Sequence, residues 1–217
     1  MNNASGHRLY LFTRFERFWH WSQALLVLSL LASGARIHGW TAAVPFRSAI
    51  LIHELAACLL VMLWVFAIFW HFTTGEWRQY IPTSRMLVAV ARYYVLGMFL
   101  GEEHPFAKTR AHKHNPLQRL AYLGLKIVIN PLIWLTGLVL LIAANGGMSG
   151  SSWILAWRDW ARLHTLAAYL MLVFVIVHVY LTTTGKTLTS YIRAMLTGWE
   201  VDSGAPAQGA ARSGDRP

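Results

Sequence analysis

Four long apolar stretches dominate the chain, and polar segments that carry most of the basic residues separate them. A helix that crosses a hydrocarbon core of about 30 Å needs about 20 predominantly apolar residues. Within such a core each backbone polar group needs a partner in the protein, and a helix supplies those partners itself. The predicted spans are Phe18–Ala35, Ala49–Phe72, Leu117–Ala144 and Trp160–Leu181.

Composition supports a membrane protein, because 56% of the 217 residues are hydrophobic and only 13% are charged. We therefore predict an all-α fold, an integral membrane four-helix bundle that occupies residues 1–200. Residues 201–217 are rich in Gly, Ala, Ser and Pro, which predicts a disordered tail. Membrane lipid is the expected surrounding of the apolar helix faces.

The distribution of basic residues predicts the orientation. Three lie in the N-terminal arm, eight in the segment assigned to the second loop and four after the last span. The opposite face has only Arg36, Arg47, Arg158 and Arg162. By the positive-inside rule both termini are cytoplasmic, in a bacterial inner membrane. The net charge of +10 belongs to this pattern, so nucleic acid is not an expected partner.

Three local features refine the architecture. Ser84 can cap an amphipathic helix over Arg85–Leu100, which we expect to lie on the cytoplasmic membrane surface. A second amphipathic segment, Leu188–Leu196, is expected on the same surface. Asn130–Pro131 should kink the third span, because proline removes a helix hydrogen bond.

Histidines inside the predicted spans indicate a functional site, since ionisable side chains are costly in a bilayer. His164 and His178 share the fourth span and are 14 residues apart. At about 100° and about 1.5 Å per residue, they fall within about 40° of one face and about 21 Å apart. One helix can therefore supply a ligand to each of two cofactors near opposite membrane surfaces.

Depth in the membrane suggests how the histidines pair. His53 and His164 both lie near the periplasmic side, as the outer pair. His178 has two candidate partners near the cytoplasmic side, His20 and His71. His71 shares a face with His53 but lies about 27 Å from it, about 6 Å more than the spacing on the fourth span. This difference favours His20, although spacing alone does not exclude His71.

The outer and inner groups contain only two or three histidines each and no thiolate, which favours haem over zinc. A pair of imidazoles completes a six-coordinate haem iron and suits electron transfer. The single cysteine, Cys58, excludes covalent attachment through a CxxCH motif, so two haem b groups are expected. Arg158 and Arg162 precede His164 and are either propionate partners or arginines that reach the membrane interface.

Three strings resemble the prokaryotic cytochrome b561-like family: FWHW (Phe18–Trp21), WHFTTGEWRQYIP (Trp70–Pro82) and KHNPLQRLAY (Lys113–Tyr122). This family includes the b-type subunits of nickel–iron hydrogenases, formate dehydrogenases and thiosulfate or tetrathionate reductases. The resemblance covers residues 14–193. It implies four axial ligands, with the first-span histidine sharing the inner haem with the later fourth-span histidine: His20, His53, His164 and His178.

The resemblance also implies an electron-transfer subunit of an oxidoreductase complex, exchanging electrons between quinone and a periplasmic redox partner. The family's quinone site lies near the inner haem, which points to His71, His112, His114 and Asn115. A stand-alone cytochrome b561, oxidising a small reductant or superoxide and reducing quinone, is the alternative. A haem-free proton-coupled transporter fits less well, because four spans leave little room for alternating access.

Overall fold

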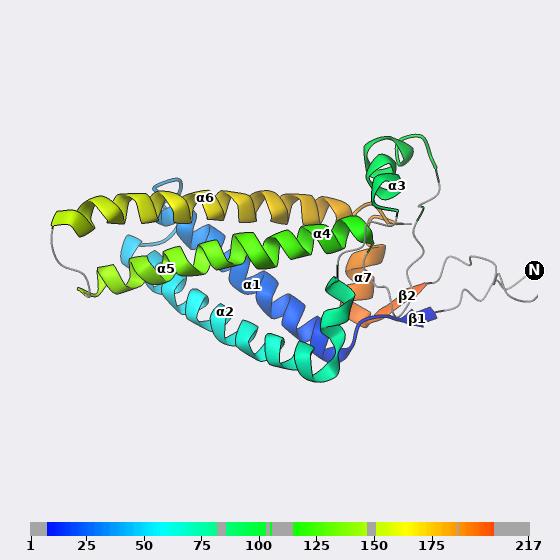
Figure 1. The fold of residues 1–217 in the computed structure, drawn as a ribbon, viewed down its shortest axis with the longest axis horizontal. Coiled ribbons are helices and arrows are strands. Elements are labelled where there is room, and N and C mark those ends of the chain that lie inside the picture. Colours follow the sequence, from blue (N-terminus) through cyan, green and yellow to red (C-terminus); the bar gives the residue numbers. More distant parts are fainter. Residues whose placement is uncertain are drawn as a thin grey trace, which may run out of the picture.

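The computed structural model describes residues 8–81, 86–102, 105, 115–146, 151–185 and 187–201. Most of these residues are helical, and the long helices run alongside one another (Figure 1). The long helices are α1 (Arg14–Ile37), α2 (Phe46–Thr74), the continuous run α4–η3–α5 (Pro116–Gly124, Leu125–Ile129 and Asn130–Ala144) and α6 (Ser151–Thr182).

Three of these helices are long and apolar enough to cross a membrane: Phe46–Thr74, Pro116–Ala144 and Trp157–Thr182. They cover the predicted second, third and fourth spans. The predicted first span lies within α1, whose first half carries Trp, His, Ser and Gln among its apolar residues. These polar side chains lower its hydropathy, so a membrane crossing by α1 stays a prediction.

The long helices form two pairs. α1 packs along α2 and α5 packs along α6, whereas direct contacts between the two pairs are few among the described residues. Small residues dominate the buried positions of these helices: Ala49, Ala56, Ala67, Thr136 and Ala167. Side chains bridge the pairs, as where Trp64 of α2 meets Trp134 of α5 with ring centroids 5.0 Å apart. Large side chains such as these therefore make contacts between the two helix pairs.

The two ends of the helix set differ (Figure 1). We name the end with the α1–α2 and α5–α6 connections the loop end. The opposite end, the sheet end, holds β1 (Arg8–Tyr10) paired antiparallel with β2 (Trp199–Val201). There Nη1 of Arg17 also donates to the carbonyl of Leu196, at 2.6 Å, so the two ends of the described chain come together.

Short helices at the sheet end only partly match the predicted amphipathic segments. α7 (Ser190–Thr197) matches the second one closely. The first is shorter than predicted, since α3 (Leu87–Arg92) and the π-helical η2 (Tyr93–Gly97) follow Met86. Met86, with φ 61°, occupies the N-cap position expected for Ser84, which lies outside the described residues.

η1 (Glu76–Tyr80), a 3-10 helix, follows α2. The count of basic residues in the second loop included Arg119 and Lys126. Both residues belong to the third long helix, Arg119 in α4 and Lys126 in η3. The basic asymmetry between the loops remains without them. The kink predicted at Asn130–Pro131 stays a prediction. The helix changes to the π-helical turn η3 just before these two residues and continues as α5 from Asn130. The predicted disordered tail falls almost wholly outside the described residues.

Candidate haem sites

The loop-end pair consists of His53 from α2 and His164 from α6. Their ring centroids are 6.2 Å apart and their planes are inclined at 71°. The two residues are far apart in sequence and belong to different helix pairs. The fold therefore brings these two histidine rings close together, with their planes steeply inclined, across the space between the helix pairs.

The sheet-end pair consists of His20 from α1 and His178 from α6. Their ring centroids are 6.1 Å apart, with planes inclined at 47°. α6 thus contributes one histidine to each pair, as the spacing of 14 residues predicted. The partner of His178 in this arrangement is His20.

This separation fits a metal held between two imidazoles. With each metal–nitrogen bond about 2 Å long, opposed rings keep their centroids about 6 Å apart. Within the described part of the chain, no group of three or more His, Cys, Asp or Glu is arranged to hold a bare metal ion. Each pair offers two nitrogens, and a porphyrin brings the other four. The donor set therefore fits haem.

Hydroxyl groups hold the rings of the loop-end pair. Nδ1 of His53 lies 3.0 Å from Oγ of Ser33 on α1, and Nδ1 of His164 lies 2.9 Å from Oγ1 of Thr136 on α5. In each case the hydroxyl lies on the helix that packs along the histidine's own helix, α1 along α2 and α5 along α6. A hydrogen bond at Nδ1 leaves Nε2 as the nitrogen for an axial bond, the arrangement usual for metal-binding histidines.

Aromatic rings surround the sheet-end pair instead. Phe174 stacks on His178, with centroids 5.8 Å apart and planes inclined at 11°. Trp21 meets His20 edge-on at 5.2 Å. Nδ1 of His20 is buried and has no hydrogen-bond partner among the described residues. Packing, rather than a hydroxyl, orients these two rings.

His71, the other candidate partner of His178, is placed differently. Its side chain is buried near the end of α2, and Nδ1 donates to the carbonyl of Ala67 at 2.6 Å. Trp19 and Trp70 contact its ring edge-on, at 5.4 and 5.1 Å. These contacts tie His71 to its own helix and to α1.

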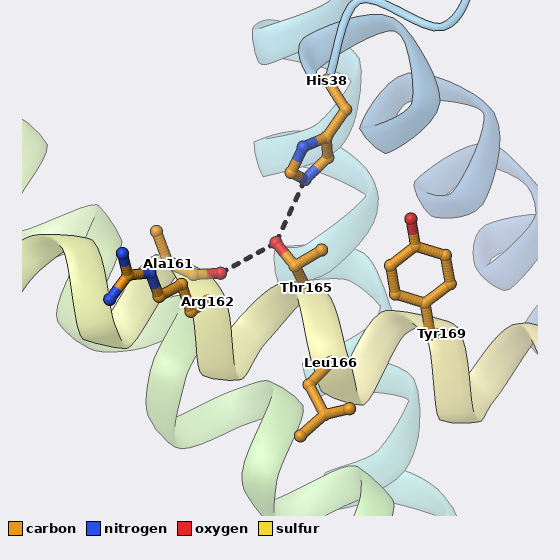
Figure 2. A pocket seen from close by; sticks show the side chains of 6 residues that line it. All are labelled: His38, Ala161, Arg162, Thr165, Leu166 and Tyr169. Atoms are coloured by element: carbon orange, nitrogen blue, oxygen red, sulfur yellow. Dashed lines mark hydrogen bonds between the residues drawn. The ribbon is translucent and has the colours of Figure 1, made fainter.

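The predicted propionate partners lie on exposed turns of α6. Arg162 donates to Asp159 at 2.9 Å, and both side chains are about 70% exposed. Arg158 is also exposed. Arg162 lines an open pocket of about 450 Å³ with His38, Ala161, Thr165, Leu166 and Tyr169 (Figure 2).

Figure 2 shows how the end of α1 meets α6 at this pocket. Nε2 of His38 lies 3.2 Å from Oγ1 of Thr165, which itself donates to the carbonyl of Ala161 at 2.8 Å. Thr165 directly follows His164 in α6, although neither His53 nor His164 lines the pocket. Sequence periodicity did not point to His38, because this residue caps the C-terminal end of α1, beyond the apolar stretch.

Among the predicted quinone-site residues, Asn115 has a structural role. Its side chain caps α4 by accepting from the backbone of Gln118 at 2.8 Å, and its amide donates to Tyr94 at 3.2 Å. Burial raises the pKa of Tyr94, so its hydroxyl stays neutral. His112 and His114 lie outside the described residues.

The residues that sequence reasoning missed are those beside the ligand rings. They include two dipeptides in which a hydroxyl residue precedes glycine, Ser33–Gly34 and Thr136–Gly137. Small and hydroxyl residues in membrane helices commonly mark positions of close packing. That signal was available in the sequence, but it does not say which side chain packs there.

The sequence is similar to those of known proteins. The family model for prokaryotic cytochrome b561 matches residues 11–198. A protein of Escherichia coli (strain K12) named "Putative cytochrome YdhU" is 35% identical over 202 residues, which is 89% of this chain and 75% of that protein. No solved structure gives a significant match. The extent of the family match shows that this chain belongs to the prokaryotic cytochrome b561 family of membrane cytochromes.

Proposed function

We propose that the chain is a dihaem b-type cytochrome that carries electrons across the membrane, between the quinone pool and a partner redox protein. One observation carries this proposal: two opposed histidine pairs, each about 6 Å between ring centroids, share α6. The two histidines of each pair would hold one haem, and the bound haem would supply an iron able to exchange one electron.

The ligand set supports electron transfer over oxygen chemistry. Two histidines would hold each iron, a ligand set that would suit electron transfer and not substrate binding at the metal. The proposed ligands come from three helices: His20 on α1, His53 on α2, and His164 and His178 on α6. Helices are rigid, so the rings keep their positions when the iron changes its charge.

We place the four long helices across a bacterial inner membrane as a four-helix bundle, with α1 as its first span. The first and last described residues then lie on the cytoplasmic side, as the basic residues of the loops favour. The apolar side chains of α3 and η2 support a position on the membrane surface, because Val88 and Val95 are 80% and 67% exposed.

The quinone site is proposed at the sheet end, near the His20–His178 pair. Oxidation of a quinol releases two electrons and two protons, so the site needs a proton acceptor. His71 is the candidate, and because Nδ1 donates to the backbone, proton exchange would use Nε2. His112, His114 and Asn115 remain further candidates, with Asn115 already engaged as a helix cap.

At the loop end we propose the periplasmic contact with a redox partner. Arg158 and Arg162 are candidates for binding the propionates of the haem held by His53 and His164, because guanidinium groups pair well with carboxylates. In the described structure Arg162 contacts Asp159, so this role requires the side chain to exchange partners.

Haem content tests the proposal directly. The purified full-length chain should contain two non-covalently bound haem b groups in a pyridine haemochrome assay. The reduced-minus-oxidised spectrum should show two low-spin components. One haem or fewer at full occupancy would contradict the dihaem assignment.

Electron donors separate the partnered cytochrome from the stand-alone alternative. A quinol should reduce both haems of the purified protein, and superoxide or a small reductant such as ascorbate should do so much more slowly. Fast reduction by the small reductant, followed by electron transfer to quinone without any partner, would favour the stand-alone oxidoreductase.

A further inference from the structure

We propose that Ser33–Gly34 and Thr136–Gly137 form matched cradles that position the loop-end ligands and lower the reduction potential of the haem they bind. The inference rests on the proposed dihaem function and assigns these residues a positioning role. Each cradle lies on the helix that packs beside the ligand's own helix, α1 beside α2 and α5 beside α6.

The hydroxyl groups act as acceptors toward the histidines, because their protons are engaged elsewhere. Oγ of Ser33 donates to the carbonyl of Ser29 at 2.7 Å, one turn earlier in α1. Oγ1 of Thr136 donates to the carbonyl of Leu132 at 2.6 Å in the same way. Each oxygen therefore presents a lone pair to Nδ1–H of the facing ring, which fixes both the tautomer and the ring orientation.

The glycines let the backbone approach the same edge of each ring. A Cβ atom at Gly34 would lie 3.6 Å from Cε1 of His53, and one at Gly137 would lie 3.1 Å from Cε1 of His164. The second distance is tighter than ordinary van der Waals contact. Each ring thus lies with its Nδ1–Cε1 edge on a hydroxyl–glycine dipeptide, on opposite sides of the site.

A hydrogen bond accepted from Nδ1–H makes the imidazole a more basic ligand. A more basic axial ligand stabilises ferric iron more than ferrous iron, so it lowers the reduction potential. The His20 ring has no such hydrogen bond among the described residues. The cradles therefore make the two haem sites differ, because they lower the reduction potential of the loop-end haem only.

Replacing Thr136 by valine keeps the shape of the side chain and removes the hydroxyl. In a redox titration of the purified full-length chain, Thr136→Val should raise the potential of one haem only. That haem should be the one whose signal disappears in His53→Ala. The ferrous-to-ferric ratio of the loop-end haem at a fixed potential should rise about tenfold, or about 59 mV for one electron.

Matched variants separate a positioning role from general disturbance of the fold. Thr136→Ser keeps the hydroxyl and should restore the wild-type potential. Ser33→Ala should shift the same haem in the same direction as Thr136→Val. Ser29→Ala removes a similar hydroxyl, which donates to Leu25 at 2.8 Å, and should leave both potentials unchanged.

The outcomes are distinguishable. If the wild-type protein lacks two low-spin haems, the proposed function fails before any variant is made. If it holds both haems but Thr136→Val and Ser33→Ala leave the potentials unchanged, the cradle proposal alone is wrong. Loss of only the loop-end haem in Thr136→Val, with retention in Thr136→Ser, would support it. If Thr136→Val does not fold, Ser33→Ala decides.

Discussion

The two histidine pairs have nearly equal ring separations but different surroundings. At the loop end, hydroxyl groups of α1 and α5 hold His53 and His164 at Nδ1. At the sheet end, Phe174 stacks on His178 and Trp21 contacts the edge of His20. The same spacing is thus reached by hydrogen bonds in one case and by aromatic packing in the other.

This difference shows that ligand spacing and ligand orientation have separate causes. Helix packing sets the distance between the rings, because both pairs link α6 to the α1–α2 pair. The neighbouring side chains set how each ring is turned and how basic it is. Two sites built from the same residue type can therefore have different redox properties.

Loss of a proposed axial histidine should have the largest effect. His53→Ala and His164→Ala should each abolish one low-spin haem signal, and His20→Ala and His178→Ala should each abolish the other, because each removes a bond to iron. Low-temperature absorption and electron paramagnetic resonance spectra of the purified variants would measure this.

His71→Ala serves as the matched control for this pairing, since it removes a buried histidine whose Nδ1 donates to its own helix at Ala67. Both haem signals should persist in it. The pairing would be wrong if His71→Ala removed the sheet-end haem while His20→Ala spared it.

The two glycines of the loop-end site should respond unequally to alanine. Gly137→Ala should lower occupancy of the loop-end haem, since a Cβ at 3.1 Å displaces the His164 ring, at a cost of about 1–3 kcal/mol. Gly34→Ala, with 3.6 Å to the ring, should retain full occupancy. The haem-to-protein ratio of both variants tests this. Equal losses of haem in the two variants would show that the distance from the added Cβ to the histidine ring does not decide haem occupancy.

Removing an aromatic contact should affect the sheet end more weakly. Phe174→Leu keeps an apolar side chain but loses the stacked ring, which is worth about 0.5–1.5 kcal/mol. We expect faster loss of the sheet-end haem on warming, with the loop-end haem unaffected, followed by absorbance at the Soret band. An equal effect on both haems would indicate a general weakening of the helix packing.

Trp21→Phe should have the smallest effect of these substitutions. The indole Nε1 donates to the carbonyl of Met195 at 3.3 Å, a long and exposed hydrogen bond. Its loss should cost about 0.5–1 kcal/mol of stability, and phenylalanine keeps a ring beside His20. Thermal unfolding should shift slightly, with both haem spectra unchanged. Loss of the sheet-end haem would show that Trp21 orients His20 more strongly than its packing suggests.

Much of the helical organisation followed from the sequence alone. Apolar length predicted the helices that became α2, the Pro116–Ala144 run and α6, because backbone hydrogen bonds in a membrane must be satisfied within each segment. The 14-residue spacing placed His164 and His178 on one face of α6, since helix periodicity is a local property. Boundaries were less accurate where caps depend on the surrounding chain, as at Met86.

Tertiary structure decided what lies opposite each residue. The sequence left His20 and His71 as possible partners of His178, because both have a depth near the same membrane surface. Only the rotation and packing of α1 and α2 set the His20 ring 6.1 Å from His178 and turned His71 toward Ala67, Trp19 and Trp70. The contacts of Ser33 with His53 and of Thr136 with His164 could likewise be recognised only in the tertiary structure. A hydroxyl in a membrane helix becomes informative once its neighbour across the helix interface is known.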